Sequence, residues 1–133
     1  LWIYNIDTYV ENGMEKTDIE NAEGCLHVSY SKEPNMSFVD YDINDNVSKV
    51  VEKEQISTWA SVGSYGFSSV ELFEKIYEKS YLSKMTEEVG GERYIAPMYS
   101  VMLSLGMRVV APKLDQNLVH VLGTPEDLLK FDE

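Results

Sequence analysis

The feature that most constrains the fold is an abrupt change of hydrophobic period at residue 68. The preceding segment, Trp59 to Phe67, is rich in β-forming residues and contains Gly63 and Gly66. Glycines inside a strand let a ligand or another backbone approach closely. Ser68 and Glu71 then have the spacing of a capping box. Apolar residues follow at helical spacing, at Phe73, Ile76, Tyr77 and Tyr81. The pattern predicts a strand that leads into a helix from about Ser69 to Thr86.

The remaining elements are predicted from shorter patterns. Leu1 to Ile6 is a nearly continuous apolar run, typical of a strand covered on both faces in a parallel sheet. The turn residues at 44–46 predict an antiparallel hairpin between strands at 37–43 and 47–52. Further strands are expected at 25–30, 107–111 and 118–122. Residues 10–24 are expected to be mainly loop.

Two more helices are predicted near the end of the chain. The first spans about Glu92 to Leu105, and Pro97 moves its expected start toward Ala96 because proline fits only the first turn. The second is short, from Pro125 to Phe131, with Thr124 as its N-cap. Strands mixed with helices indicate one α/β domain over residues 1–133, with a mixed sheet, a β-hairpin and flanking helices.

Charge limits the partners of this domain. Eleven Lys and Arg against 23 Asp and Glu give a net charge of −12, which repels nucleic acid and anionic membrane surfaces. An anionic small molecule would need a local cation or metal ion, and Lys53 is the candidate cation. The single cysteine, Cys25, excludes an intrachain disulfide and is expected to be a small buried strand residue.

The sequence also gives expectations about context. No apolar run approaches the roughly 20 residues that cross a bilayer, and no leader pattern is present, so a cytoplasmic location is expected. The chain opens on the apolar run Leu1-Trp2-Ile3-Tyr4 without an initiating Met. We therefore expect part of a longer protein, whose exposed sheet edge favours self-association.

Three segments carry possible chemistry. Asp7 ends the first predicted strand, and in open α/β sheets ligands bind beyond the carboxyl ends of strands. Glu52 and Lys53 close the hairpin and precede a Gly-x-Tyr-x-Phe strand that begins at Gly63. Gly123-Thr124-Pro125-Glu126-Asp127-Leu128 is a glycine turn that leads into a capped helix. Each segment also has a purely structural explanation: a turn cap, a surface ion pair and a helix start.

Together these segments resemble the later part of sugar-1-phosphate nucleotidyltransferases, most closely the type of bacterial capsular-polysaccharide synthesis. The resemblance extends from Trp2 to Phe131. It implies part of a Rossmann-like domain that transfers a nucleotidyl group from an NTP to a sugar 1-phosphate and releases pyrophosphate. That family opens with a Gly-rich nucleotide-binding loop, and nothing of that kind precedes Leu1. The chain is therefore expected to be the sugar-binding portion, inactive as an isolated fragment.

The resemblance also implies roles for individual residues. Asp7 would ligate Mg²⁺ and Lys53 would hold the sugar 1-phosphate, and these two are the catalytic candidates. Glu52 and Glu92 would contact the sugar, with Gly63 and His120 as further substrate contacts. Mg²⁺ accepts one or two carboxylates together with water and phosphate oxygens, so one Asp can suffice. Many family members carry a second metal-binding Asp where this chain has Val121, which puts a two-metal site in doubt.

Alternatives remain for several of these residues. Glu92 is equally explained as a first-turn glutamate favoured by the helix dipole. For Arg93 the alternatives are a bidentate contact with a ligand phosphate and a solvated surface position, and the second is favoured. The tyrosines are favoured as core residues over base-stacking ones. Two rival functions remain: a non-catalytic or degenerate sugar-phosphate-binding module, and a nucleotide-sugar glycosyltransferase-like domain. The second class commonly has two acids flanking one residue, whereas Asn5-Ile6-Asp7 has one.

Overall fold

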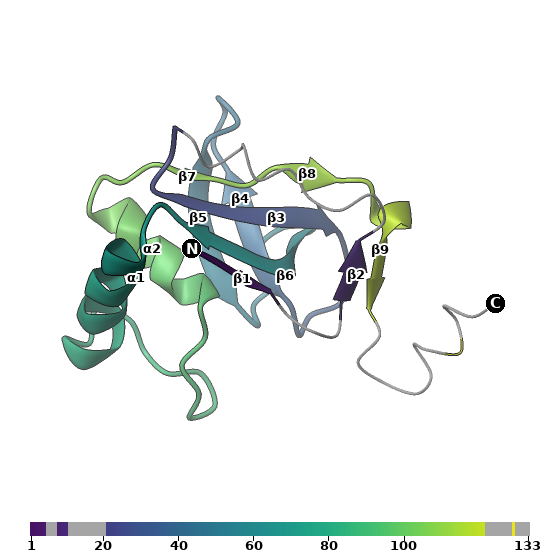
Figure 1. The fold of residues 1–133 in the computed structure, drawn as a ribbon. Coiled ribbons are helices and arrows are strands. Elements are labelled where there is room, and N and C mark those ends of the chain that lie inside the picture. The colour runs from purple at the N-terminus through teal and green to yellow at the C-terminus, as the bar shows by residue number, and fades with distance from the viewer. Residues whose placement is uncertain (5–7, 11–20, 122–128, 130–133) are drawn as a thin grey trace.

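A computed structural model describes residues 1–4, 8–10, 21–121 and 129 of the chain. Within them, one seven-stranded sheet follows the order β5-β4-β6-β3-β7, with β1 paired to β6 and β8 paired to β3. A separate two-stranded sheet pairs β2 with β9. Figure 1 shows α1 and α2 together on one side of the large sheet and the β2–β9 pair on the opposite side. The predicted α/β class with a mixed sheet and flanking helices is confirmed.

The centre of the large sheet is the antiparallel pair β3 (Gly24–Tyr30) and β6 (Trp59–Phe67). Both strands are buried along almost their whole length, and their side chains are mainly small or aromatic. A register shift between Leu26 and Val28 bends β3 against its partner. Two short strands, β7 (Val109–Val110) and β8 (Lys113–Leu114), run parallel to β3 on its other edge.

The predicted hairpin is confirmed as β4 (Ser37–Tyr41) and β5 (Val47–Glu52). Its turn is held by Asp42, whose Oδ1 accepts hydrogen bonds from the backbone N–H of Asn44 at 2.8 Å and of Asn46 at 3.0 Å. An Asx-type turn of this kind sets the register of the two strands. As a result, Ser37 lies directly opposite Glu52.

The prediction for the first strand is wrong. Strand β1, described over Trp2–Tyr4, pairs antiparallel with the end of β6, with Trp2 opposite Gly66. The rest of the predicted strand, Asn5 and Ile6, lies outside the described residues. Leu1 and Tyr4 are 39% and 42% exposed, so the strand is not covered on both faces. A short apolar run does not distinguish a parallel from an antiparallel partner, because the pairing is set by distant strands.

The first helix is shorter than predicted and starts one residue later. Its N-cap is Ser69, whose Oγ accepts a hydrogen bond from the N–H of Leu72 at 3.0 Å, and the predicted cap Ser68 lies outside the helix. Helix α1 spans Val70–Tyr77 and continues as a five-residue π-helix, η2 (Glu78–Leu82). The helical pattern therefore ends at Leu82 rather than Thr86.

The second helix begins where Pro97 indicated. Helix α2 spans Ala96–Ser104 with the proline in its first turn. Its buried Tyr99 donates hydrogen bonds to the carbonyls of Cys25 at 3.2 Å and Gly66 at 3.0 Å, and its ring stacks on Phe67. Tyr99 thus fastens α2 to both central strands. Cys25 is a buried free cysteine, as predicted.

The small sheet pairs β2 (Thr8–Val10) with β9 (Val119–Val121), which follows the 3₁₀ turn η3 (Gln116–Leu118). Strand β9 matches the strand predicted at 118–122, whereas β2 was not predicted. The predicted helix at 125–131, with its cap Thr124, lies outside the described residues. Among the helices that the structure describes, none has the length and apolar character to span a membrane.

Candidate functional site

Two adjoining cavities share the lining residues Met36 and Ser61. The first lies among β2, β3, β6, η3 and β9, and the second lies where β4, β5 and β6 meet the loop before α2. We call the first, of about 300 Å³, the hydroxyl cavity, and the second, of about 340 Å³, the carboxylate cavity. The hydroxyl cavity is lined by Thr8, Ser29, Tyr30, Ser31, Met36, Ser61, Val62, Gln116, Asn117 and Val119. The carboxylate cavity is lined by Asn35, Met36, Ser37, Glu52, Ser61, Tyr65, Arg93, Tyr94 and Ile95.

Glu52 is the acid of the carboxylate cavity. The hairpin register places it opposite Ser37, whose hydroxyl donates a hydrogen bond to the Glu52 carboxylate. Burial raises the pKa of Glu52, while the Ser37 hydrogen bond and the charge of Lys53 act in the other direction. An ionised carboxylate has about four acceptor positions, so Ser37 leaves capacity for hydroxyl groups of a ligand.

Lys53 stands at the rim of this cavity. Its backbone has φ of 58°, in the left-handed region, and its N–H donates to the Met36 carbonyl at 2.9 Å. Its ammonium lies 4.9 Å from the centroid of the Tyr94 ring. A hydrogen bond with Tyr94 is the main cause of a raised Lys53 pKa, and the charges of Glu92 and Glu52 raise it further. The lysine therefore remains a cation beside the cavity.

The loop before α2 forms one wall of the carboxylate cavity. Val89 and Glu92 pair through two backbone hydrogen bonds of 3.0 and 3.1 Å around Gly90 and Gly91. Both glycines have positive φ, which this tight two-residue turn requires. Glu92 itself is exposed beside Lys53, so its contact with a sugar stays a prediction.

Sequence reasoning missed the residues that follow Glu92. Arg93 forms an ion pair with Glu88, with Nε 2.7 Å from Oε2, and its Nη1 donates to the Tyr77 hydroxyl at 2.8 Å. These contacts raise the pKa of Arg93. Arg93 and Tyr94 line the cavity, as do Ser37 and the buried Tyr65. The signal for Ser37 was available, because the predicted hairpin register sets it opposite Glu52.

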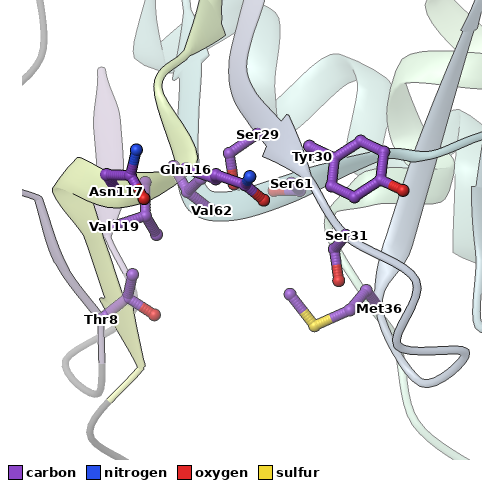
Figure 2. Close-up of a pocket in the computed structure, with 10 residues that line it drawn as sticks. All are labelled: Thr8, Ser29, Tyr30, Ser31, Met36, Ser61, Val62, Gln116, Asn117 and Val119. Atoms are coloured by element: carbon purple, nitrogen blue, oxygen red, sulfur yellow. The ribbon is translucent and has the colours of Figure 1, made fainter.

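Among the residues that the structure describes, none of those that line the hydroxyl cavity is charged. Figure 2 shows that hydroxyl and amide side chains from β2, β3, β6 and η3 surround this space. Ser29 and Ser61 are buried, and the Ser61 hydroxyl accepts a hydrogen bond from the N–H of Gly63 at 3.1 Å. The cavity thus offers neutral donors and acceptors at the carboxyl end of β3.

Two predicted site residues, Gly63 and His120, are neighbours in sequence of lining residues of the hydroxyl cavity and are not in its lining themselves. Gly63 follows Val62 on β6 and has φ of 86°, a conformation that favours glycine. His120 lies on β9, next to the lining residue Val119 and opposite Tyr9. Asp7 lies outside the described residues, directly before Thr8. The predicted residues therefore divide between the two cavities, with Glu52, Lys53 and Glu92 at the carboxylate cavity.

Metal binding was assigned to Asp7 on resemblance. In the part of the chain that the structure describes, no group of three or more His, Cys, Asp or Glu side chains is placed to hold a metal ion. Because Asp7 is not in that part, its role as a Mg²⁺ ligand stays a prediction. The same holds for a contact of His120 with phosphate.

Comparison with solved structures shows which fold this chain has. The chain superposes on the nucleoside-diphosphate-sugar pyrophosphorylase from Vibrio cholerae RC9 with a TM-score of 0.85 and 26% identity, over 98% of this chain and 56% of that one. The fold is that of a nucleotidyltransferase. The CTP:phosphocholine cytidylyltransferase from Streptococcus pneumoniae shares it, with a TM-score of 0.68 and 17% identity over 98% of this chain and 55% of that one.

The nucleotidyltransferase fold is thus matched over a little more than half the length of these two structures. No protein-family model and no curated protein matches the chain.

Proposed function

We propose that this chain forms the acceptor side of a nucleotidyltransferase that transfers a nucleotidyl group from an NTP to a sugar 1-phosphate and releases pyrophosphate. The single observation that carries the proposal is the carboxylate cavity, where a half-buried acid ends β5 and the next residue, a lysine, has its ammonium beside the lining residue Tyr94. The donor nucleotide would be held by the part of the matched fold that this chain does not cover.

The chemistry of the cavity favours a sugar phosphate as acceptor. The Glu52 carboxylate can accept hydrogen bonds from sugar hydroxyls, and Ser37 keeps it oriented through its own hydrogen bond. The Lys53 ammonium is a compact point charge suited to a phosphate. Two unit charges about 4 Å apart attract by roughly 4 kcal/mol at an effective dielectric of 20. In a chain of net charge −12, such a local cation offsets the repulsion of an anionic substrate.

The reaction needs little proton transfer from the protein. A phosphate monoester has a second pKa near 6 and is mostly dianionic at neutral pH. One of its oxygens attacks the α-phosphorus of the NTP in line, the bond from that phosphorus to the bridging oxygen breaks, and pyrophosphate leaves. Lys53 would hold the attacking phosphate in place, and Glu52 would orient the sugar behind it. Preorganised charges of this type are the main source of rate enhancement in phosphoryl transfer.

Magnesium is proposed as the cofactor, with Asp7 as its protein ligand. When bound, the ion would neutralise charge on the phosphates. The position of Thr8 in the lining of the hydroxyl cavity supports a phosphate-binding role at that end of the site. The neutral hydroxyls and amides of that cavity can donate hydrogen bonds to phosphate or sugar oxygens without adding charge.

The proposal is tested by pyrophosphate release in the complete enzyme. We expect release with an NTP, Mg²⁺ and a sugar 1-phosphate such as glucose 1-phosphate, and little or none with phosphocholine, because phosphocholine has no free hydroxyl on its alkyl group to donate to Glu52. The 133-residue chain alone is expected to release none. Preference for phosphocholine would overturn the acceptor assignment. Binding of sugar phosphate without release by the complete protein would instead identify a non-catalytic binding module.

A further inference from the structure

A π-helix carries a tyrosine from α1 to the wall of the carboxylate cavity. Phe73 and Tyr77 stack with ring centroids 6.3 Å apart and planes 29° apart. Between Tyr77 and Tyr81, across the start of η2, the centroids are 5.6 Å apart and the planes tilt by 54°. The wider π turn therefore changes the direction in which Tyr81 points relative to the preceding rings. Such turns occur frequently at functional sites.

The Tyr81 hydroxyl is a fixed donor to the cavity wall. It donates a hydrogen bond to the main-chain carbonyl of Tyr94, and its residue is 6% exposed. Burial, with a contribution from the charge of Glu52, raises the pKa of Tyr81 to about 12. The phenol consequently stays protonated throughout the physiological range, and the hydrogen bond is always available.

Tyr94 connects the Tyr81 hydrogen bond to the position of the Lys53 ammonium. The Tyr94 ring lines the carboxylate cavity, and the Lys53 ammonium lies 4.9 Å from its centroid. A cation over an aromatic face is attracted by the electrons of the ring. The position of the ammonium therefore depends on where the Tyr94 backbone is held, and Tyr81 is the side chain that holds it.

The π turn has an energetic cost that an ordinary α-helical end would not have. The Ser80 hydroxyl is buried in η2 with no hydrogen-bond partner among the described residues. A buried polar group without a hydrogen-bond partner lowers the stability of the folded state. Local costs of this kind persist where the surrounding structure requires a particular geometry. Here that geometry is the direction of Tyr81.

We propose that Tyr81 is a positioning residue for the acceptor site: its hydroxyl fixes the Tyr94 backbone, and the Tyr94 ring in turn places the Lys53 ammonium for the phosphate. This inference rests on the proposed function for the role of the phosphate. The placement of Lys53 by Tyr81 is a property of the ligand-free protein and can be measured there.

The test compares two tyrosine-to-phenylalanine changes that remove the same kind of bond. Like Tyr81, Tyr41 donates to a main-chain carbonyl, that of Ala111 at 2.6 Å, and has a cation over its ring: Lys113 Nζ at 4.4 Å for Tyr41 and the Arg93 guanidinium at 5.8 Å for Tyr81. Tyr41 lines neither cavity. Y41F is therefore a matched control for Y81F. Both are expected to lower the melting temperature by similar amounts.

Two readouts separate positioning from stability. In Y81F, the Lys53 pKa, followed by NMR of the labelled ammonium in the ligand-free protein, should fall toward the ordinary lysine value. Affinity for glucose 1-phosphate, measured by calorimetry, should weaken about three- to tenfold, the loss of one hydrogen bond. Y41F should change neither quantity. In a K53M background, Y81F should have no further effect on affinity.

Several results would overturn the inference. One is an unchanged Lys53 titration in Y81F, and another is an affinity loss in Y81F that persists undiminished with K53M. If wild-type protein does not bind glucose 1-phosphate, the proposed function fails, but the Lys53 titration still decides the positioning claim. Should Y81F not fold, Tyr94→Leu keeps the carbonyl and removes the ring, and it must abolish the same titration shift.

Discussion

A hydrogen bond from a tyrosine hydroxyl to a main-chain carbonyl occurs both in the core beneath α2 and at the rim of the carboxylate cavity, but its role differs between the two regions. In the core, Tyr99 donates to the carbonyls of Cys25 and Gly66 and is completely buried. At the rim, Tyr81 donates to the carbonyl of Tyr94 next to a half-buried acid. The core bond joins three elements that apolar packing already brings together. The rim bond holds a loop that otherwise turns on two glycines.

The two regions also differ in how many energetically unfavourable features they contain. Among the described residues, no Asp, Glu, Lys or Arg side chain is buried in the core. The rim contains Lys53 in a left-handed backbone conformation and Glu52 with a raised pKa. Real proteins break local rules mainly at functional sites and compensate for them elsewhere. The contrast therefore predicts that core substitutions change stability alone, whereas rim substitutions change binding and catalysis.

The largest expected effect is on the core. Tyr99→Ala should lower the free energy of unfolding by about 3–5 kcal/mol, the usual cost of removing a large buried aromatic side chain. Chemical denaturation monitored by circular dichroism measures this loss. Tyr99→Phe is the milder companion variant, and it should retain wild-type affinity for a sugar 1-phosphate. Altered affinity in a folded Tyr99→Phe protein would break the separation between core and rim.

At the rim, Lys53→Ala should lower turnover of the complete enzyme roughly 10²–10³-fold, as the loss of one preorganised charge does. Its unfolding free energy should change by less than about 0.5 kcal/mol, the usual range for a surface residue. Lys49→Ala changes an exposed lysine on β5, four residues before Lys53, and is the matched control that should leave kinetics unchanged. Wild-type turnover in Lys53→Ala would show that Lys53 is an ordinary surface lysine.

A distinct signature is expected at Asp7. Asp7→Asn keeps the side-chain shape but loses the anionic ligand, so activity should require more Mg²⁺ than in the wild type. The measurement is kcat/KM across a Mg²⁺ titration, with the melting temperature as a check on folding. If the Mg²⁺ dependence is unchanged, Asp7 has only a structural role at the end of its segment.

The smallest expected effect is on the pH dependence of stability, which Glu52 at the rim is expected to influence. Because burial raises the folded-state pKa of Glu52, the folded protein favours the protonated acid, and ionisation opposes folding. The Glu52 contribution to stability is therefore present below the unfolded-state pKa and is lost as pH rises through the folded-state value. Glu52→Gln should remove this dependence and slightly stabilise the protein at neutral pH. Thermal melts from pH 4 to 8 test it, and a destabilised variant at pH 7 would contradict the assignment.

Local patterns predicted much of this fold. The hairpin followed from its turn residues, and the start of α2 followed from Pro97, because both signals act through nearby backbone geometry. The pairing of β1 and the π turn after Tyr77 could not be read in the same way. Strand partners depend on distant segments. A separation of four residues between Tyr77 and Tyr81 is compatible with both an α-helix and a π-helix.

The candidate site shows the same division. Glu52 and Lys53 were found by resemblance, and the structure places both at one cavity. Arg93 and Tyr94 were not assigned, because their position depends on the contact of their loop with α1 and η2. Only tertiary packing, which the spacing of residues does not encode, brings that loop to the cavity.

The central claim is that the carboxylate cavity binds the acceptor sugar phosphate, and calorimetric titration with glucose 1-phosphate tests it most directly. The titration compares wild-type protein with Glu52→Gln and with Glu54→Gln, an exposed acid two residues away. We expect wild-type affinity in Glu54→Gln and about tenfold weaker binding in Glu52→Gln, in which a charged acceptor is lost. Equal affinities in all three proteins, or no binding to the wild type, would contradict the account.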